Sequence, residues 1–383
     1  MKTLVVLGRE KLLSFAELSA REPSARHYGQ IATVRSDSLL DINSFGGSIK
    51  AAVVEAELPI SAQLGEIESS VAEILKNKSA QSNSKFSFGV SAYDSKSFSP
   101  RRLQLLGIKL KKTLTSAGTS ARYVQPKKGL TLTAAQLKFN KLTDNGCEII
   151  IATTKSAIFV ATTYAYQDID SYSKRDWGRP IRDSKVGMLP PKLAQIMLNL
   201  SEAKPNQTIY DPFCGNGVIL QEALLMQHPV SGSDIDPSMV KATQQNLEWL
   251  SQNYPIEHEF RVWEEDATKI AKLPKNCAVV TEGYLGKPLA YVQSDRELAE
   301  ISQPVEKIYY DFLKKLRSLL EPGQKSVISF PVWQTKSGLK HMVVIDQISE
   351  LGYTFKQCCD QNTLIYKRDN QMVGREIAVL IAK

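Results

Sequence analysis

The chain has 383 residues, too many for one ordinary hydrophobic core, and its composition, 43% hydrophobic and 23% charged, is that of a globular protein. No apolar stretch reaches the roughly 18 residues of a membrane span and no signal peptide is visible, so we expect a cytoplasmic protein. The five cysteines are odd in number and contain no Cys-x-x-Cys pair, which disfavours a disulfide framework or a zinc site, and the four histidines add no metal pattern.

Basic residues are concentrated in the N-terminal half. Residues 1–180 carry a net charge of +9 and residues 181–383 a net charge of −1, which together give the +8 of the whole chain. No acid occurs between Asp94 and Asp144, where the basic residues are Lys96, Arg101, Arg102, Lys109, Lys111, Lys112, Arg122, Lys127, Lys128, Lys138 and Lys141. Ordinary exposed faces mix charges of both signs, so we interpret this stretch as a nucleic-acid surface; a merely solvated face is the alternative.

The first 166 residues predict two small α/β modules, 1–80 and 81–166. In the first, a capping box from Ser14 to Glu17 is expected to open a helix. In the second, Ser99 is the expected N-cap of a helix with Pro100 in its first turn. The predicted strands are residues 4–7, 26–42, 48–58, 86–92, 121–125, 148–153 and 158–163, and a further helix is predicted at 67–75.

Residues 167–191 lose periodicity and contain Trp177, Gly178 and Pro180, so we interpret them as a linker. Residues 192–383 then alternate strands and helices. The predicted strands are 208–210, 229–233, 259–263, 277–281, 326–332, 363–367 and 376–381, and the predicted helices are 193–200, one starting near Val218, 238–250 and 305–319. This alternation indicates a parallel sheet covered by helices on both faces.

A glycine turn after the strand 208–210 indicates a nucleotide-type ligand. Gly215 and Gly217 allow a tight turn and close backbone approach, and the following helix directs its free N–H groups at the ligand. Asp234 lies 19 residues after Gly215, the distance at which a doubly wound sheet places a carboxylate on the ribose hydroxyls of an adenosine. Leu220 replaces the third glycine of a dinucleotide fingerprint, and no Gly-Lys-Ser/Thr follows, so NAD is disfavoured and a triphosphate is excluded.

Three acids around this turn favour a cationic ligand without phosphates, such as S-adenosylmethionine. Asp211, Asp234 and Asp266 each follow a predicted strand, and ligands of open α/β sheets bind beyond the carboxyl ends of the strands. We expect Asp211 near the sulfonium and amine, Asp234 on the ribose and Asp266 on the adenine amino group. Glu264 and Glu265 are alternatives for the last role.

The runs Asp211 to Gly217 and Gly232 to Pro237 resemble motifs I and II of class I methyltransferases that modify amino groups of RNA or DNA. Upstream, Arg179-Pro180 and Gly187 to Ala194 resemble the lead-in of the THUMP-domain tRNA methyltransferases that make N2-methylguanosine at position 10. The resemblance covers nearly the whole chain. It implies a ferredoxin-like module, a THUMP module that binds the acceptor end of tRNA, and a class I (Rossmann-like) methyltransferase domain with a seven-stranded sheet. It also leaves room for an activating partner protein.

The expected binding residues follow from these motifs and from the basic stretch. The cofactor residues are Asp211, Phe213, Gly215, Gly217, Asp234, Ile235, which would pack on the adenine, and Asp266. The RNA-binding residues are Arg101, Lys111, Lys112, Arg122, Lys127 and Lys128.

One loop departs from the family pattern. Thr281-Glu282-Gly283-Tyr284 stands where the family carries Asp-Pro-Pro-Tyr or Asn-Pro-Pro-Tyr, a motif in which oxygens accept from the target N–H groups and the aromatic ring stacks on the base. Tyr284 keeps the ring, and the acceptor is either Thr281, in register, or Glu282. Guanine presents N1–H and N2–H side by side, and a carboxylate can receive both, so Glu282 suits guanine.

We therefore predict an S-adenosylmethionine-dependent tRNA guanine-N2-methyltransferase that transfers the methyl group directly, without a metal. Two alternatives stay open. The same fold could act on an adenine N6 amino group of DNA or RNA, or the chain could be a tRNA-binding protein with an inactive methyltransferase domain.

Overall fold

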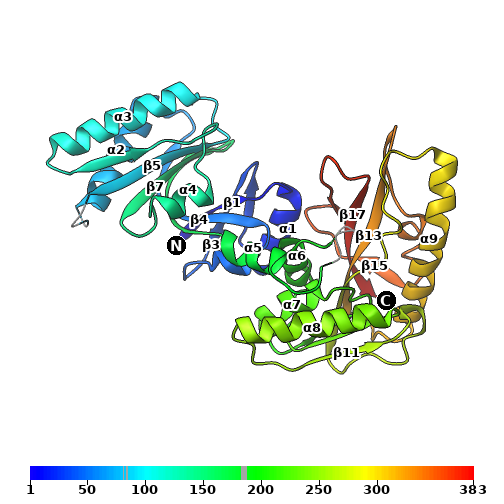
Figure 1. Cartoon of the computed structure of the whole chain (residues 1–383). Coiled ribbons are helices and arrows are strands. Elements are labelled where there is room, and N and C mark those ends of the chain that lie inside the picture. The colour runs from blue at the N-terminus through cyan, green and yellow to red at the C-terminus, as the bar shows by residue number, and fades with distance from the viewer. Residues whose placement is uncertain (81, 83–84, 183–187) are drawn as a thin grey trace. The chain divides into compact units, whose positions relative to one another are not determined.

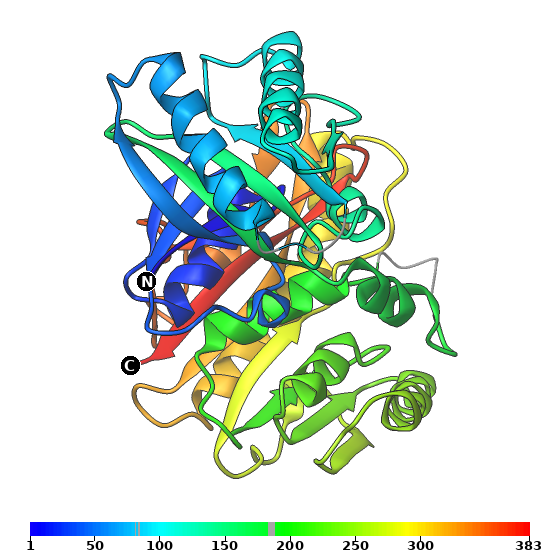
Figure 2. The same cartoon turned by 90° about the vertical axis from the view of Figure 1, so that its left-hand side faces the viewer.

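The computed structural model describes residues 1–80, 82, 85–182 and 188–383 (Figures 1 and 2). The chain divides into two compact units, Met1–Ile169 and Asp170–Lys383, and each unit has its own sheet. Within the expected linker, residues 183–187, and with them Gly187 of the lead-in motif, lie outside the described residues.

The first unit is built on an eight-stranded sheet in the order β2-β3-β1-β4-β8-β7-β5-β6. The strands are β1 (Lys2–Leu7), β2 (Arg26–Tyr28), β3 (Ile31–Arg35), β4 (Ser48–Pro59), β5 (Phe86–Tyr93), β6 (Ala121–Val124), β7 (Gly146–Thr153) and β8 (Ala157–Tyr166). The helices are α1 (Lys11–Arg21), the short η1 (Ile42–Ser44), α2 (Leu64–Ser79), α3 (Pro100–Ser116) and α4 (Ala134–Phe139). Because β4 pairs with β8, the two modules expected from the sequence share one continuous sheet.

Helices α2 and α3 cover one face of this sheet beside β5 and β7 (Figure 1). Leu75 of α2 and Leu110 of α3 are buried in one apolar cluster with Phe88 and Ile149 of the sheet, as the helical spacing of their leucines requires. The predicted cap of α3 is confirmed, since the Ser99 hydroxyl accepts the third backbone N–H of the helix at 3.2 Å.

The predicted capping box at Ser14 is wrong. Ser14 lies inside α1, where its hydroxyl donates to the carbonyl of Glu10 at 2.8 Å. Glu17 is fully buried, and its two oxygens accept the backbone N–H groups of Gly46 and Gly47, each at 2.8 Å. The glutamate thus serves a loop distant in sequence, a role that the local pattern does not reveal.

The second unit has a nine-stranded sheet in which the path β11-β10-β9-β12-β13-β17-β15 is extended by β14 beside β13 and β16 beside β17. The strands are β9 (Thr208–Asp211), β10 (Val230–Asp234), β11 (Phe260–Glu264), β12 (Cys277–Glu282), β13 (Lys325–Thr335), β14 (Gly338–Lys340), β15 (Tyr353–Phe355), β16 (Thr363–Tyr366) and β17 (Val373–Ala382). The helices are α5 (Ile169–Trp177), which begins at the boundary of the units, α6 (Pro191–Ser201), α7 (Val218–Leu225), α8 (Pro237–Asn253), η2 (Ala267–Lys269), α9 (Asp295–Arg317) and η3 (Val343–Ile345).

The predicted Rossmann-like α/β sheet is confirmed, but it has nine strands rather than the seven expected. Strands β11, β10, β9, β12 and β13 run parallel to their neighbours, and β17 returns antiparallel beside β13. The two short strands β14 and β15 were not predicted, since three residues are too few to show a strand periodicity.

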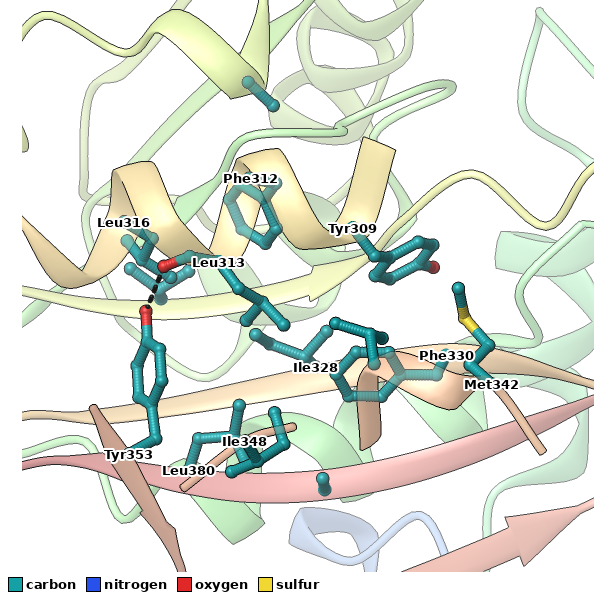
Figure 3. Close-up of a cluster of buried hydrophobic side chains, with 14 of the residues drawn as sticks. Tyr309, Phe312, Leu313, Leu316, Ile328, Phe330, Met342, Ile348, Tyr353 and Leu380 are labelled. Atoms are coloured by element: carbon teal, nitrogen blue, oxygen red, sulfur yellow. Dashed lines mark hydrogen bonds between the residues drawn. The ribbon is translucent and has the colours of Figure 1, made fainter. Parts of the chain in front are cut away.

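Helix α9 lies on the face of the sheet opposite α6 (Figure 1). Its buried stripe includes Phe312 and Leu316, which belong to one apolar cluster with Ile328 of β13 (Figure 3). The Tyr353 hydroxyl donates to the carbonyl of Leu313 at 2.8 Å and so satisfies its polar atom inside this cluster.

Residues 169–177 form helix α5, although the sequence predicts a linker there. The Arg175 guanidinium donates to both carboxylate oxygens of Glu222 on α7, at 2.7 Å and 3.2 Å, and both side chains are buried. Burial raises the pKa of Glu222, and the charge of Arg175 opposes that rise. The partner lies 47 residues away, so no local pattern could have shown what holds this helix.

Candidate functional site

The carboxyl ends of four neighbouring parallel strands meet at one edge of the second sheet. β9 ends at Asp211, β10 at Asp234, β11 at Glu264 and β12 at Glu282. A cavity of about 880 Å³ lies there, a volume typical of a small-molecule site. Its lining includes the predicted residues Asp211, Phe213, Gly215, Asp234, Ile235, Asp266, Glu282 and Tyr284.

The glycine turn forms a backbone cradle on one wall of the cavity. Gly215 and Gly217 both have left-handed backbone conformations, with φ of 51° and 78°. A Cβ built on Gly215 would meet only the carbonyl oxygen of Phe213, at 4.0 Å, so it would occupy open space of the cavity. Gly217 does not line the cavity, and a Cβ there would lie 2.8 Å from Thr243. Gly215 therefore keeps the ligand space open, and Gly217 permits close packing behind it.

Asp211 is a buried carboxylate whose hydrogen-bond donors among the described residues include no cation. Its Oδ1 accepts from the Thr281 hydroxyl at 2.6 Å and from the Phe213 N–H at 3.1 Å. Burial raises its pKa to about 7, against these two donors, and the negative charges of Asp234 and Glu282 add to the rise. A cationic ligand in the cavity would favour the ionised form.

Asp234 bridges the turn and the next helix. Its Oδ2 accepts the Gly215 N–H at 2.9 Å and its Oδ1 accepts the Asp236 N–H at 3.0 Å. Burial raises its pKa, and these backbone donors oppose the rise. The α8 cap is Asp236, whose side chain accepts the Ser238 N–H at 2.8 Å, so Asp234 is not needed for capping. Ile235 is 65% exposed and lines the cavity.

Glu264 ends β11, and Glu265 and Asp266 follow it directly. Of these three acids, Asp266 lines the cavity. It caps η2, accepting the backbone N–H and the hydroxyl of Thr268 at 2.9 Å and 2.7 Å. Burial opposes ionisation, but Thr268 and Lys269 outweigh it and lower the pKa of Asp266. Glu265 does not line the cavity, and its carboxylate accepts a hydrogen bond from the Trp263 indole N–H at 3.0 Å.

The loop that departs from the family pattern places its two candidate acceptors differently. Thr281 is fully buried, does not line the cavity and donates its hydroxyl to Asp211. Glu282 lines the cavity, and Tyr284, 44% exposed, lines it as well. The arrangement therefore gives Glu282 and Tyr284 access to a substrate, whereas Thr281 acts on the carboxylate of Asp211.

Arg375 of β17, which the sequence analysis missed, binds Glu282. The guanidinium Nε donates to Oε1, and Nη2 donates to Oε2 at 3.3 Å. Arg375 is 2% exposed and does not line the cavity. The charge of Glu282 raises the pKa of Arg375 although burial opposes it.

Tyr309, a residue not singled out from the sequence, explains why position 283 is a glycine. A Cβ at Gly283 would lie 2.5 Å from the hydroxyl oxygen of Tyr309. Tyr309 is fully buried and its hydroxyl donates to the Ser329 carbonyl at 2.9 Å, so it cannot move aside freely. The second proline of the family motif would need this space. The departure from that motif was the one sequence signal that could have pointed to changed surroundings.

Two further predicted elements reach the cavity. Met188 and Leu189 of the lead-in line it, as far as that motif lies within the described residues. Phe213 packs its ring edge-to-face on Phe312 of α9, with centroids 5.0 Å apart. The turn is thus anchored to the apolar cluster under α9.

In the first unit, all eleven cations of the acid-free stretch are exposed. Lys109 pairs with Glu68 at 2.6 Å, and the Arg122 guanidinium donates to Asn140 at 3.1 Å. In the described part of the chain, the predicted RNA-binding residues Lys111, Lys112, Lys127 and Lys128 have no ion-pair partner. Their charges are therefore available to a polyanion.

Phe139 is an exposed aromatic residue within the same stretch, and the sequence analysis missed it. It ends α4 and is 84% exposed, directly between Lys138 and Asn140, the residue that Arg122 contacts. Exposed rings beside cations are typical of surfaces that stack unpaired bases.

Within the described ranges, no helix is long and apolar enough to cross a membrane. No group of three or more His, Cys, Asp or Glu residues in those ranges could hold a metal ion.

Known proteins are similar to part of this chain in sequence. Residues 179–332 match the UPF0020 family model, described as an RMKL-like methyltransferase domain. The tRNA (guanine(10)-N2)-dimethyltransferase of Methanothermobacter thermautotrophicus is 37% identical over 145 residues, which are 38% of this chain and 39% of that protein. Its counterpart from Pyrococcus abyssi is 32% identical over 161 residues, 41% of each chain. The matched segment thus spans about two fifths of the length of these relatives.

Solved structures are similar over nearly the whole chain. TrmN from Thermus thermophilus matches with a TM-score of 0.56 and 17% identity, covering 100% of both chains. SMU.472 complexed with SAH matches with a TM-score of 0.52 and 13% identity, covering 100% of this chain and 98% of that one. At these identities the likeness concerns the fold. The second unit therefore has the Rossmann-like fold of methyltransferases, and residues 179–332 are similar to an RMKL-like methyltransferase domain.

Proposed function

We propose that this chain is an S-adenosylmethionine-dependent tRNA guanine-N2-methyltransferase acting at position 10. The names of the curated relatives support the substrate, and the cavity at the strand ends supports the chemistry. The observation that carries the proposal is that one cavity unites the Gly215 cradle, Asp211 and Asp234 with Glu282 and Tyr284. Action on tRNA implies a cytoplasmic location.

The cofactor side of the cavity fits S-adenosylmethionine, which when bound supplies an electrophilic methyl group on a sulfonium. Asp211 offers a buried negative charge to the cationic end of the ligand. Asp234 keeps lone pairs beyond those used by its two backbone donors and would accept from the ribose hydroxyls. The exposed side chain of Ile235 would cover the adenine, and Asp266 would accept from its amino group.

The target side of the cavity is formed by the loop after β12. Tyr284 would stack on the target base, and Glu282 would accept an N–H of its exocyclic amino group. Accepting that hydrogen bond draws electron density onto a nitrogen whose lone pair is otherwise delocalised into the ring, and so favours attack on the methyl carbon. Transfer would break the methyl–sulfur bond and leave the cofactor as a neutral thioether, and the nitrogen would release one proton to water, which keeps the methylated amino group neutral.

The first unit would hold the tRNA. Its exposed cations would contact phosphates, and Phe139 would stack on an unpaired base, a combination that binds single-stranded ends. We assign this role to residues 81–166 as a THUMP module, with residues 1–80 as the ferredoxin-like module that shares its sheet.

Mass spectrometry of nucleosides tests the proposal. Purified protein is incubated with unmodified tRNA transcript and methyl-labelled S-adenosylmethionine, and the tRNA is digested. Labelled N2-methylguanosine or its dimethyl form, mapped to position 10, is the expected result. Labelled N6-methyladenosine would instead assign an adenine N6 methyltransferase, and an absence of label would leave a tRNA-binding protein without this activity.

A further inference from the structure

The ion pair between Arg375 and Glu282 limits how the carboxylate can meet a substrate. Arg375 projects from β17 and Glu282 ends β12, with β13 between the two strands. Nε and Nη2 of one guanidinium face the two oxygens of one carboxylate, which is the bidentate arrangement of an arginine fork. The side chain of Arg375 is 2% exposed, so water competes little for these bonds.

A carboxylate has about four acceptor positions, two on each oxygen. A bidentate fork occupies the two inner positions, one on each oxygen, which lie side by side and accept two parallel N–H groups. The remaining two positions point away from each other, so they cannot receive two parallel N–H groups of one base. With Arg375 in place, Glu282 therefore cannot accept guanine N1–H and N2–H together. The expectation from the sequence, that the carboxylate receives both groups, is not met.

The cavity is lined by Glu282 and not by Arg375. The side chain of Glu282 is 16% exposed. Backbone freedom is also restricted, because Glu282 is still in register with Ser329 of β13 and Gly283 packs on Tyr309. The carboxylate is thus held in one orientation with one outer acceptor position available to the cavity.

We propose that Arg375 is a positioning residue that presents Glu282 to the target as a single acceptor for one N–H of the exocyclic amino group. The proposal rests on the methyltransferase function proposed above. In this proposal the Arg375 fork holds Glu282 rigidly in place, as two prolines hold the corresponding loop in the family motif. It also implies that the site recognises the amino group at Glu282 without recognising guanine N1–H there.

A substituted substrate tests the single acceptor in the wild-type protein. A tRNA transcript is made with 2-aminopurine in place of the guanine that the wild-type protein methylates; this base keeps the amino group and lacks N1–H. We expect single-turnover methylation of the two transcripts to agree within about tenfold. If Glu282 accepted both donors, the bare N1 lone pair would face the carboxylate, and a loss of a hundredfold or more would overturn the proposal.

A variant tests the positioning role. Arg375→Lys keeps the charge but replaces the fork by a single ammonium group. We expect the single-turnover rate to fall at least tenfold while the dissociation constants for S-adenosylmethionine and tRNA stay within threefold, a separation that a general loss of folding would not give. A wild-type rate in this variant would overturn the proposal. An absence of methylation of the guanine transcript by the wild-type protein would instead refute the proposed function, and this inference with it.

Discussion

Each unit contains a buried carboxylate, and the two differ in the charge of their hydrogen-bond donors. In the first unit, Glu148 of β7 accepts from Lys50 at 2.5 Å, from Ser91 at 2.5 Å and from Thr163 at 2.6 Å. In the second unit, Asp211 accepts from two neutral donors, has no cation among its donors in the part of the chain that the structure describes, and lines a cavity. Both side chains are almost inaccessible to solvent.

The difference separates a structural charge from a functional one. Glu148 and its donors link the four adjacent strands β4, β8, β7 and β5, so the network fixes their register and needs no ligand. Asp211 has a raised pKa and neutral hydrogen-bond donors, and the cationic end of S-adenosylmethionine would favour its ionised form. Glu282 combines both features, because it is paired with Arg375 on one side and faces the cavity on the other.

The largest effect is expected from opening the structural network. Glu148→Gln leaves Lys50 as a buried cation without a charged partner, which should cost about 3 to 5 kcal/mol in the free energy of unfolding. Urea unfolding of the full chain measures this loss. Affinity for S-adenosylmethionine, measured in the folded variant, should not change, because Glu148 lines no part of the cavity.

The matched control is Glu57→Gln on the same sheet, which removes a solvent-exposed partner of Lys2. An exposed ion pair contributes little, so this control should unfold within about 1 kcal/mol of the wild-type protein. Equal losses in the two variants would contradict the special role of the buried network.

Asp211→Asn should have the opposite effect on stability. Because the folded pKa of about 7 lies above the ordinary 3.8, the stability contributed by this group is complete below pH 3.8 and is lost as the pH rises through about 7. The neutral amide avoids that loss and should stabilise the ligand-free protein by roughly 2 kcal/mol at pH 8, and by less at pH 5. Thermal unfolding at the two pH values measures this. A variant less stable than the wild-type protein at pH 8 would contradict the account of Asp211.

A smaller effect is expected on the surface of the first unit. Replacing Lys111, Lys112, Lys127 and Lys128 together by Gln should weaken tRNA binding at low salt by at least about tenfold and reduce the salt dependence by about one unit of slope per lost phosphate contact. Titrations at several salt concentrations measure both quantities. A control of equal charge change replaces four exposed lysines of the second unit, namely Lys204, Lys272, Lys275 and Lys336. Equal slopes in the two variants would mean that the stretch is only a solvated face.

The smallest effect concerns the exposed ring. Phe139→Ala should weaken binding of tRNA by about fivefold, close to 1 kcal/mol and at the lower end of the range for a stacked base. Leu105→Ala, which shortens an exposed apolar side chain on α3, is the control and should bind as the wild-type protein does. The same loss in the control, or none at Phe139, would remove the ring from the RNA surface.

How much of this could be predicted from the sequence depends on the distance between interacting residues. The strand, the glycine turn and Asp234 lie within a short segment, and the sequence predicted their convergence correctly. Arg375 lies 93 residues from Glu282, and Arg175 lies 47 residues from Glu222; both pairs form through the tertiary fold. Local patterns carry no trace of such pairs, so the fork on Glu282 and the helix α5 were missed.

The loop 281–284, which departs from the family motif, shows a second limit of prediction from the sequence. The sequence showed that Gly283 replaces a proline, but the reason is Tyr309, whose hydroxyl occupies the space of a Cβ. The sequence likewise left Thr281 and Glu282 as alternatives, with Glu282 better suited to guanine. Burial separates them, since Thr281 faces Asp211 and Glu282 faces the cavity.

We expect the carboxylates that line the cavity at the strand ends to bind S-adenosylmethionine. Calorimetric titration of the cofactor into the wild-type protein, Asp234→Ala and Glu248→Ala measures this binding. Asp234→Ala should weaken binding at least tenfold by removing charge-assisted hydrogen bonds to the ribose, whereas Glu248→Ala removes an exposed carboxylate of α8 that does not line the cavity and should keep the affinity. Wild-type affinity in a folded Asp234→Ala variant, or no binding to the wild-type protein, would contradict the account.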